Sequence, residues 1–199
     1  MIMSDREDDS ATIIHIARGE RMPATRQKLY TVEYIRALPE GKRAELIDGI
    51  VYDLAAPSRI HQRISMMLSR VIASHIESKG LPCDVYAAPF AVFLDDYNYL
   101  EPDLSVICDQ NKLSDRGCEG APDWIIEIVA PASQRMDYMI KLNKYRAAGV
   151  GLYWIVDPDL AAVIVHDFAH EQMQRYRFTD DIPVGLCDDL VIRLAGYDR

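Results

Sequence analysis

Two long amphipathic stretches, separated by short apolar runs, constrain the fold of this chain more than any other feature. The first begins at Ser58, and its apolar residues recur at steps of three and four, which predicts a helix with one apolar face. Those residues are Ile60, Ile64, Met67, Leu68, Val71, Ile72 and Ile76. The second stretch follows Pro131-Ala132-Ser133 and ends at Gly149, a predicted C-cap. Both helices need an apolar surface to cover, so a sheet is expected beside them.

Short runs of apolar or alternating residues supply the strands of that sheet. Strands are predicted at about 83–94, 103–108, 123–129, 152–158, 162–168 and 174–178, with a polar loop at 109–121. A short helix is expected from Thr31, and Asp48-Gly49 between two apolar runs predicts a hairpin. The order of helix, strands, helix and strand predicts an α/β protein with a mixed β-sheet flanked by helices and additional antiparallel strands.

Length and composition suggest one globular domain with an N-terminal extension. The chain has 199 residues, of which 49% are hydrophobic and 27% charged. We expect a single domain over 28–199 and a tail or arm over 1–27, whose apolar stretch 13–17 could add a strand or an oligomer contact. No apolar run is long enough to span a bilayer and the N-terminus lacks the pattern of a secretory signal, so we expect a cytoplasmic protein without a membrane partner.

Cysteine usage and net charge limit the class of function. The cysteines at 83, 108, 118 and 187 are far apart and form no C-x-x-C pair, which predicts free thiols in a reducing compartment. The net charge of −9 argues against strong nonspecific binding of nucleic acid, although a local basic groove is compatible with it.

Two carboxylates stand out by their position in apolar strands. Asp103 opens one strand, and Glu127 lies inside another, where an acid is costly to bury unless it is paired or binds a metal. If the strands are neighbours, both acids can converge on one Mg²⁺ ion. Lys141 lies four residues after Asp137 and could supply a cation. Alternatively, Glu127 pairs with a structural arginine, and Lys141 and Asp137 form an ordinary surface pair.

A series of short sequence motifs, spread over roughly residues 30–195, resembles the Uma family of restriction-endonuclease-like proteins in its order. The motifs are Glu45-Leu46-Ile47-Asp48-Gly49, Pro57-Ser58 with His61, Pro102-Asp103-Leu104-Ser105-Val106, Gly120-Ala121-Pro122-Asp123 with Glu127 and Ala130-Pro131, Asp137 with Lys141 and Tyr145, Gly149-Val150, and Tyr153-Trp154-Ile155-Val156-Asp157-Pro158.

The resemblance implies a PD-(D/E)XK nuclease core, in which Asp103 is the motif aspartate and Glu127 the motif glutamate. The motif lysine should lie two residues after the glutamate, but Val129 occupies that position. The family's lysine is expected on the following helix, at Lys141. Glu45 resembles an extra acid at the start of the core. Two accessory residues are also expected, His61 at the start of the first long helix and Asp137.

These features together predict an endonuclease that hydrolyses phosphodiester bonds with Mg²⁺ or Mn²⁺. Asp103 and Glu127 would bind the metal, Lys141 would stabilise developing charge, and Glu45 would assist. The expected partners are nucleic acid, with DNA favoured, and a second copy of the chain in a dimer. The alternatives are a non-catalytic nucleic-acid-binding or scaffold protein that keeps the nuclease fold, and a hydrolase of a small phosphorylated molecule with a closed pocket.

Overall fold

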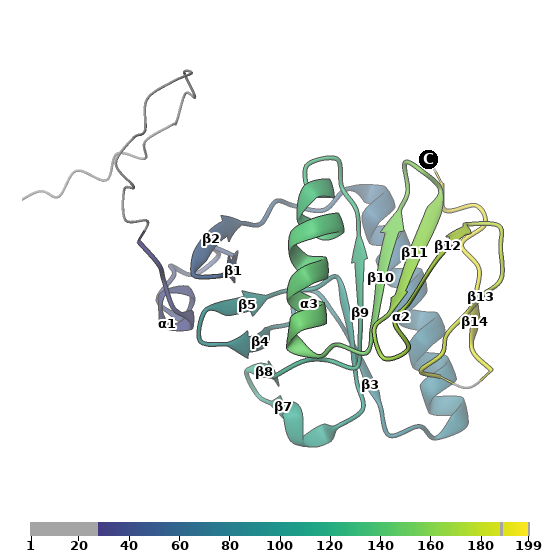
Figure 1. Cartoon of the computed structure of the whole chain (residues 1–199), viewed down its shortest axis with the longest axis horizontal. Helices are drawn as coiled ribbons and strands as arrows, with labels where there is room; N and C mark the ends of the chain where they lie inside the picture. Colours follow the sequence, from purple (N-terminus) through teal and green to yellow (C-terminus); the bar gives the residue numbers. More distant parts are fainter. Residues whose placement is uncertain (1–27, 188, 199) are drawn as a thin grey trace, which may run out of the picture.

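The fold is built around two mixed β-sheets. The computed structural model describes residues 28–187 and 189–198, so the stretch 13–17 and the rest of the expected tail lie outside the described residues (Figure 1). The sheets have six strands each, and a two-stranded sheet, β13 (Ile182–Pro183) with β14 (Val191–Ile192), lies near the C-terminal end. Within the described residues, no helix is long and apolar enough to cross a bilayer.

The central sheet has the strand order β12-β11-β10-β9-β6-β3. Its strands are β3 (Asp84–Ala87), β6 (Leu104–Ile107), β9 (Trp124–Ile128), β10 (Leu152–Asp157), β11 (Ala162–Asp167) and β12 (Gln172–Arg177). β9 and β10 are parallel and the other neighbours antiparallel, so the mixed sheet predicted from the sequence is confirmed. β9 and β10 are buried along their whole length because both faces of the sheet are covered.

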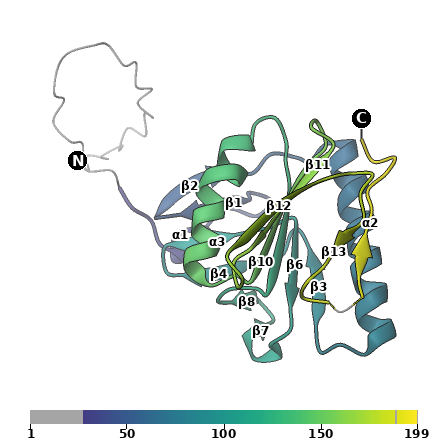
Figure 2. The same ribbon diagram turned by 45° about the vertical axis from the view of Figure 1, so that its right-hand side comes forward.

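Helices cover the two faces of the central sheet, as Figure 2 shows. On one face, Ile64 and Leu68 of α2 (Arg59–Lys79) pack in the same cluster as Ile126 of β9. On the other, Tyr145 of α3 (Leu142–Ala148) packs with Ile125. Successive residues of a strand point to opposite faces, so Glu127 faces the α3 side, like Ile125.

The predicted start of α2 at Ser58 is confirmed. The Ser58 side chain accepts a hydrogen bond from the backbone N–H of His61 at 3.3 Å, which caps the first turn. Gly80, with φ of +61°, ends the helix in the left-handed conformation that favours glycine. Five of the seven predicted apolar residues are buried, and Ile60 and Val71 pack against the same core.

The second helix differs from the prediction at its N-terminal half. Residues 131–133 form turns, and Met136–Lys141 form a π-helix that continues into α3. A π-helical turn bonds i to i+5, so it contains one residue more than an α turn and changes which side chains face inward. Here the inward side chains are Asp137 and Lys141.

The second sheet lies beside α3 and has the order β2-β1-β5-β4-β8-β7 (Figure 1). Its strands are β1 (Ala44–Ile47), β2 (Ile50–Asp53), β4 (Val92–Asp95), β5 (Asn98–Leu100), β7 (Leu113–Ser114) and β8 (Gly117–Glu119), and the short helix α1 (Val32–Arg36) packs next to β1. The predicted hairpin is confirmed, because Ile47 pairs with Ile50 across Asp48-Gly49, both at positive φ.

Two predictions around this sheet are wrong. The run 83–94 is not one strand, because β3 and β4 belong to different sheets and the cis Ala88-Pro89 bond lies between them. The polar loop 109–121 contains a 3₁₀ turn at Gln110–Lys112 and the β7–β8 hairpin. Short strands at a sheet edge have too few residues for a periodic pattern to show in the sequence.

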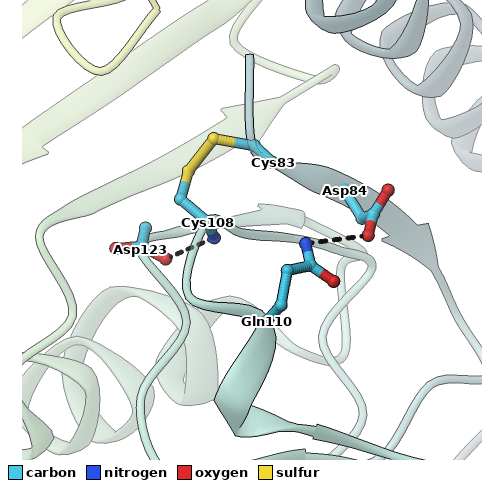
Figure 3. The surroundings of a disulfide bond; sticks show 5 residues. All are labelled: Cys83, Asp84, Cys108, Gln110 and Asp123. Atoms are coloured by element: carbon cyan, nitrogen blue, oxygen red, sulfur yellow. Dashed lines mark hydrogen bonds between the residues drawn. A yellow bond between two sulfur atoms is a disulfide. The ribbon is translucent and has the colours of Figure 1, made fainter. Parts of the chain in front are cut away.

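The expectation of four free thiols is also wrong, because Cys83 and Cys108 form a disulfide (Figure 3). The antiparallel register of β3 and β6 pairs Asp84 with Ile107, so the next residues outward are the two cysteines. They lie 25 residues apart in sequence, and only strand pairing brings them together. The backbone N–H of Cys108 also donates to Asp123 Oδ2 at 2.8 Å.

Candidate active site

Asp103 lies immediately before β6, and the neighbouring strand β9 contains Glu127. β6 and β9 are antiparallel, with Leu104 opposite Ile126, so the register continues to Asp103 opposite Glu127. Residues directly opposite in such a pair have Cβ atoms about 4.5–5.5 Å apart and point to the same face. The structure therefore brings the two predicted carboxylates near each other, and the Asp103 charge adds to the raised pKa of Glu127.

Lys141 lies at the centre of the candidate site. Its Nζ donates to Glu127 Oε1 and to Glu45 Oε1, each at 2.9 Å, and lies 4.0 Å from Asp137 Oδ1. Glu45 comes from β1 of the second sheet and also accepts a hydrogen bond from the backbone N–H of Glu101 at 3.1 Å. Three distant segments of the chain thus meet at one ammonium group.

The interpretation of Asp137 and Lys141 as a surface pair is wrong. The exposed fractions are 5% for Lys141, 3% for Asp137, 4% for Glu127 and 2% for Glu45. The π-helical turn directs both side chains inward, and β1 contributes Glu45 from the adjacent sheet. Glu127 pairs with this lysine and not with a structural arginine.

Sequence reasoning did not assign a site role to Tyr145, whose hydroxyl donates to Glu127 Oε1 at 2.7 Å. Tyr145 lies four residues after Lys141 on the same helix and is fully buried. A buried phenol needs a hydrogen-bond partner, so the spacing from Lys141 was the available signal. Lys144, by contrast, pairs with Asp48 at a more exposed position.

Burial shifts the pKa values of the cluster. Burial raises the pKa of Glu127 well above its ordinary value, and Asp103, Asp137 and Glu45 add to the rise, while Lys141 opposes it. Burial likewise raises the pKa of Asp137 to about 6, against the ammonium of Lys141 and the Ser133 hydroxyl. Burial alone would lower the pKa of Lys141, but Glu127, Glu45 and Asp137 outweigh it and raise that pKa.

Asp103 is held by two hydrogen bonds at the more open side of the site. His61 Nε2 lies 2.9 Å from Asp103 Oδ2, and the backbone N–H of Ile128 donates to the same oxygen at 2.7 Å. The Asp103 side chain is 18% exposed, against 5% for that of Glu127. The predicted accessory residue His61 therefore contacts the motif aspartate from the first turn of α2.

The second accessory residue, Asp137, is fixed by a serine at the start of its helix. Ser133 Oγ donates to Asp137 Oδ2 at 2.5 Å, and the backbone N–H of Ala130 donates to Ser133 Oγ at 3.0 Å. The polar contacts link the end of β9 to the π-helical turn. They hold Asp137 beside Lys141. Among the described residues, no hydrogen bond joins Asp137 to Asp103.

The chemistry of the acids fits a hard divalent cation. Among residues 28–187 and 189–198, no group of three or more His, Cys, Asp or Glu side chains could hold a metal ion. Mg²⁺ commonly takes only one or two protein carboxylates and completes its shell with water and substrate phosphate. The hydrogen bonds to Asp103 and Glu127 within the described chain reach Oδ2 and Oε1, which leaves the other oxygen of each carboxylate for a cation.

A mixed β-sheet with helices on both faces gives this chain the fold of a restriction-endonuclease-like α/β protein. The chain belongs to the Uma2 family, described as "Putative restriction endonuclease", whose family model matches residues 31–191. The resemblance found in the sequence is confirmed.

Comparison with individual proteins gives the same fold. A crystal structure from Anabaena variabilis ATCC 29413, described as "a putative nuclease belonging to DUF820", superposes with a TM-score of 0.71 at 21% identity and covers 84% of this chain and 96% of that one.

Two uncharacterized proteins of Synechocystis sp. are similar in sequence. The protein slr1290 is 26% identical over 120 residues, 59% of this chain and 62% of its own length. The protein sll1609 is 24% identical over 127 residues, 62% of this chain and 71% of its own length. The chain thus spans less than two thirds of slr1290.

Proposed function

We propose that this chain is a metal-dependent endonuclease that hydrolyses phosphodiester bonds in nucleic acid, with Mg²⁺ or Mn²⁺ as cofactor and DNA as the favoured substrate. One observation carries the proposal: Lys141 bonds both Glu45 and Glu127, and Asp103 lies one residue before the Leu104–Ile126 pair that precedes Glu127. Family membership supports the same class of activity.

Each side chain has a role that follows from its contacts. Asp103 and Glu127 would hold the cation, and His61 and the Ile128 N–H orient the Asp103 carboxylate. A bound Mg²⁺ would supply Lewis-acid polarisation of the phosphodiester and a water of lowered pKa. Lys141 stabilises negative charge that develops on the phosphate, and Glu45 positions Lys141.

The charge of the cluster supports a cation site. Three acids, Glu127, Glu45 and Asp137, raise the pKa of Lys141, and Asp103 adds to the raised pKa of Glu127. Buried negative charge of this kind is costly unless it is neutralised by protons or by a bound cation. A divalent ion between Asp103 and Glu127 removes that excess.

The test is cleavage by purified protein of linear, supercoiled and single-stranded DNA and of RNA, with Mg²⁺, with Mn²⁺ and with EDTA. Cleavage is expected with either metal and is expected to be lost in Asp103→Asn and Glu127→Gln. The matched controls Asp115→Asn and Glu40→Gln, at exposed positions, should cut like the wild type. Failure to cut any substrate with either metal would contradict the proposal.

A non-catalytic nucleic-acid-binding or scaffold protein is the second candidate, favoured by one observation. Val129 occupies the motif position for lysine and is buried in the apolar cluster beneath α3. This candidate predicts binding of nucleic acid that does not depend on Asp103 and no cleavage with either metal.

A homodimer is part of the proposal, because two copies can address both strands of a duplex. Light scattering on the full chain should give the mass of two copies. A mass of one chain at micromolar concentration would contradict this part of the proposal.

A further inference from the structure

The face of α2 that points away from the central sheet carries a basic depression. Its inward residues, such as Ile64 and Leu68, pack against the sheet and leave the opposite face exposed. Side chains from that face and from the C-terminal segment line a depression of about 410 Å³. We call it the α2 groove, and its lining includes Arg59, Gln62, Arg63, Met66, Arg70 and Tyr197.

The α2 groove is positively charged although the chain as a whole carries −9. Within the part of the chain that the structure describes, none of Arg59, Arg63 and Arg70 forms an ion pair with a carboxylate. No acidic residue lies in the first turn of α2. Arg59, in the first turn of α2, places a positive charge where the helix dipole opposes it.

The chemistry of the lining suits the backbone of a nucleic acid. Guanidinium groups bind phosphate oxygens with paired hydrogen bonds and remain charged at any physiological pH. The Arg63 guanidinium lies 5.2 Å from the centre of the Tyr197 ring, which supports it from one side. Met66, with 72% of its surface exposed, adds apolar contact area between the charges.

The groove begins at the end of α2 that contacts the candidate active site. His61, in the first turn of α2, has Nε2 2.9 Å from Asp103 Oδ2. Arg59 and Arg63, each two residues from His61, lie about 200° round the helix from it, on the outward face. From Arg59 to Arg70 the helix rises about 16 Å, at ~1.5 Å per residue. That length corresponds to about five nucleotides along one strand of B-DNA, at ~3.4 Å per nucleotide.

We propose that the α2 groove binds the phosphate backbone of duplex DNA. The inference rests on the proposed endonuclease function and names the surface that holds the substrate. The three arginines contact phosphates, so their contribution depends on charge and not on base sequence.

Binding of a fluorescent DNA duplex in EDTA tests the groove separately from cleavage. The groove variant replaces Arg59, Arg63 and Arg70 by glutamine. The control variant replaces three exposed arginines outside the groove, Arg36, Arg116 and Arg177, and so loses the same net charge. A third variant replaces the groove arginines by lysine. Anisotropy titrations at several salt concentrations give the slope of log K against log [salt] for each.

Each phosphate contact contributes ~0.9 to that slope, so the groove variant should lose about 2.7 of it and bind at least tenfold more weakly at low salt. The control variant and the lysine variant should keep slopes close to the wild type. Circular dichroism should show equal melting temperatures, because the groove side chains are exposed. An unchanged slope in the groove variant, or an equal loss in the control variant, would overturn the inference.

The remaining outcomes separate the groove from the proposed function and from a different partner. Groove-dependent binding by a protein that never cuts would support the groove and contradict the endonuclease. Cleavage by a groove variant that binds DNA like the wild type would contradict the groove and support the endonuclease. A competition with polyglutamate tests a different partner. If polyglutamate displaces the labelled duplex from the wild type as effectively as unlabelled DNA does, the groove binds acidic polypeptides and the inference is overturned.

Discussion

Replacing Lys141 by methionine removes the ammonium group that Glu45 and Glu127 share, while a side chain of similar length remains. The lysine is 5% exposed and donates at 2.9 Å to each carboxylate, so both carboxylates lose a buried donor in the variant. Removal of one partner from a buried ion pair costs about 3–5 kcal/mol, because the other charge stays buried and uncompensated. We expect a loss of that size at pH 8, much more than a surface pair contributes.

The loss of stability in Lys141→Met should depend on pH, and the direction of that dependence follows from the pKa shifts. In the folded protein the pKa of Asp137 is raised from 3.8 to about 6 and that of Glu127 above 4.5. A carboxyl whose pKa is higher in the folded than in the unfolded protein contributes its full stability below its ordinary pKa. That contribution is lost as the pH rises through the pKa of the folded protein. Lys141 lowers both pKa values, so Lys141→Met raises them further and extends the loss to higher pH.

The magnitude of the pH dependence can be worked out from one proton. Each pH unit across which one carboxyl of the variant keeps a proton that the unfolded chain has lost lowers stability by ~1.4 kcal/mol. Urea unfolding at several pH values, followed by fluorescence of the buried Trp124 and Trp154, measures it. The gap between variant and wild type should be small at pH 5 and largest at pH 8.

Lys144→Met is the matched control, three residues further along the same helix. Lys144 pairs with Asp48 at side-chain exposures of 25% and 61%, so its loss should cost only ~0–1 kcal/mol and change little with pH. The double variant Lys141→Met with Glu127→Gln should recover part of the stability, because it removes the unpaired charge. A loss under about 1 kcal/mol in Lys141→Met at pH 8, or one independent of pH, would refute the reasoning.

Two further predictions address single contacts. Tyr145→Phe removes the 2.7 Å hydrogen bond to Glu127 and should cost about 1.5–3 kcal/mol in urea unfolding with an unchanged circular dichroism spectrum; a neutral effect would mean that the hydroxyl does not hold the carboxylate. Alkylation of the unfolded protein without reductant should leave Cys83 and Cys108 unmodified, and a mass spectrum with both modified would contradict the disulfide.

Features that depend on neighbours in sequence could be predicted from the sequence. The Ser58 cap, the apolar face of α2 and the turn at Asp48-Gly49 are specified by residues within a few positions of one another. The α/β class followed from the order of such segments. The resemblance to the family pointed to Asp103 and Glu127 as motif residues. Short edge strands such as β7 were missed, because two residues show no period.

Only the tertiary structure decided how the candidate site is assembled. Glu45 and Lys141 are 96 residues apart, and their contact depends on the second sheet lying against the π-helical turn. The sequence placed Lys141 four residues from Asp137, which is equally compatible with a surface pair and with a buried one. Burial is a property of the whole packing arrangement, and burial shifts the pKa values of a lysine–carboxylate pair that would be ordinary at the surface.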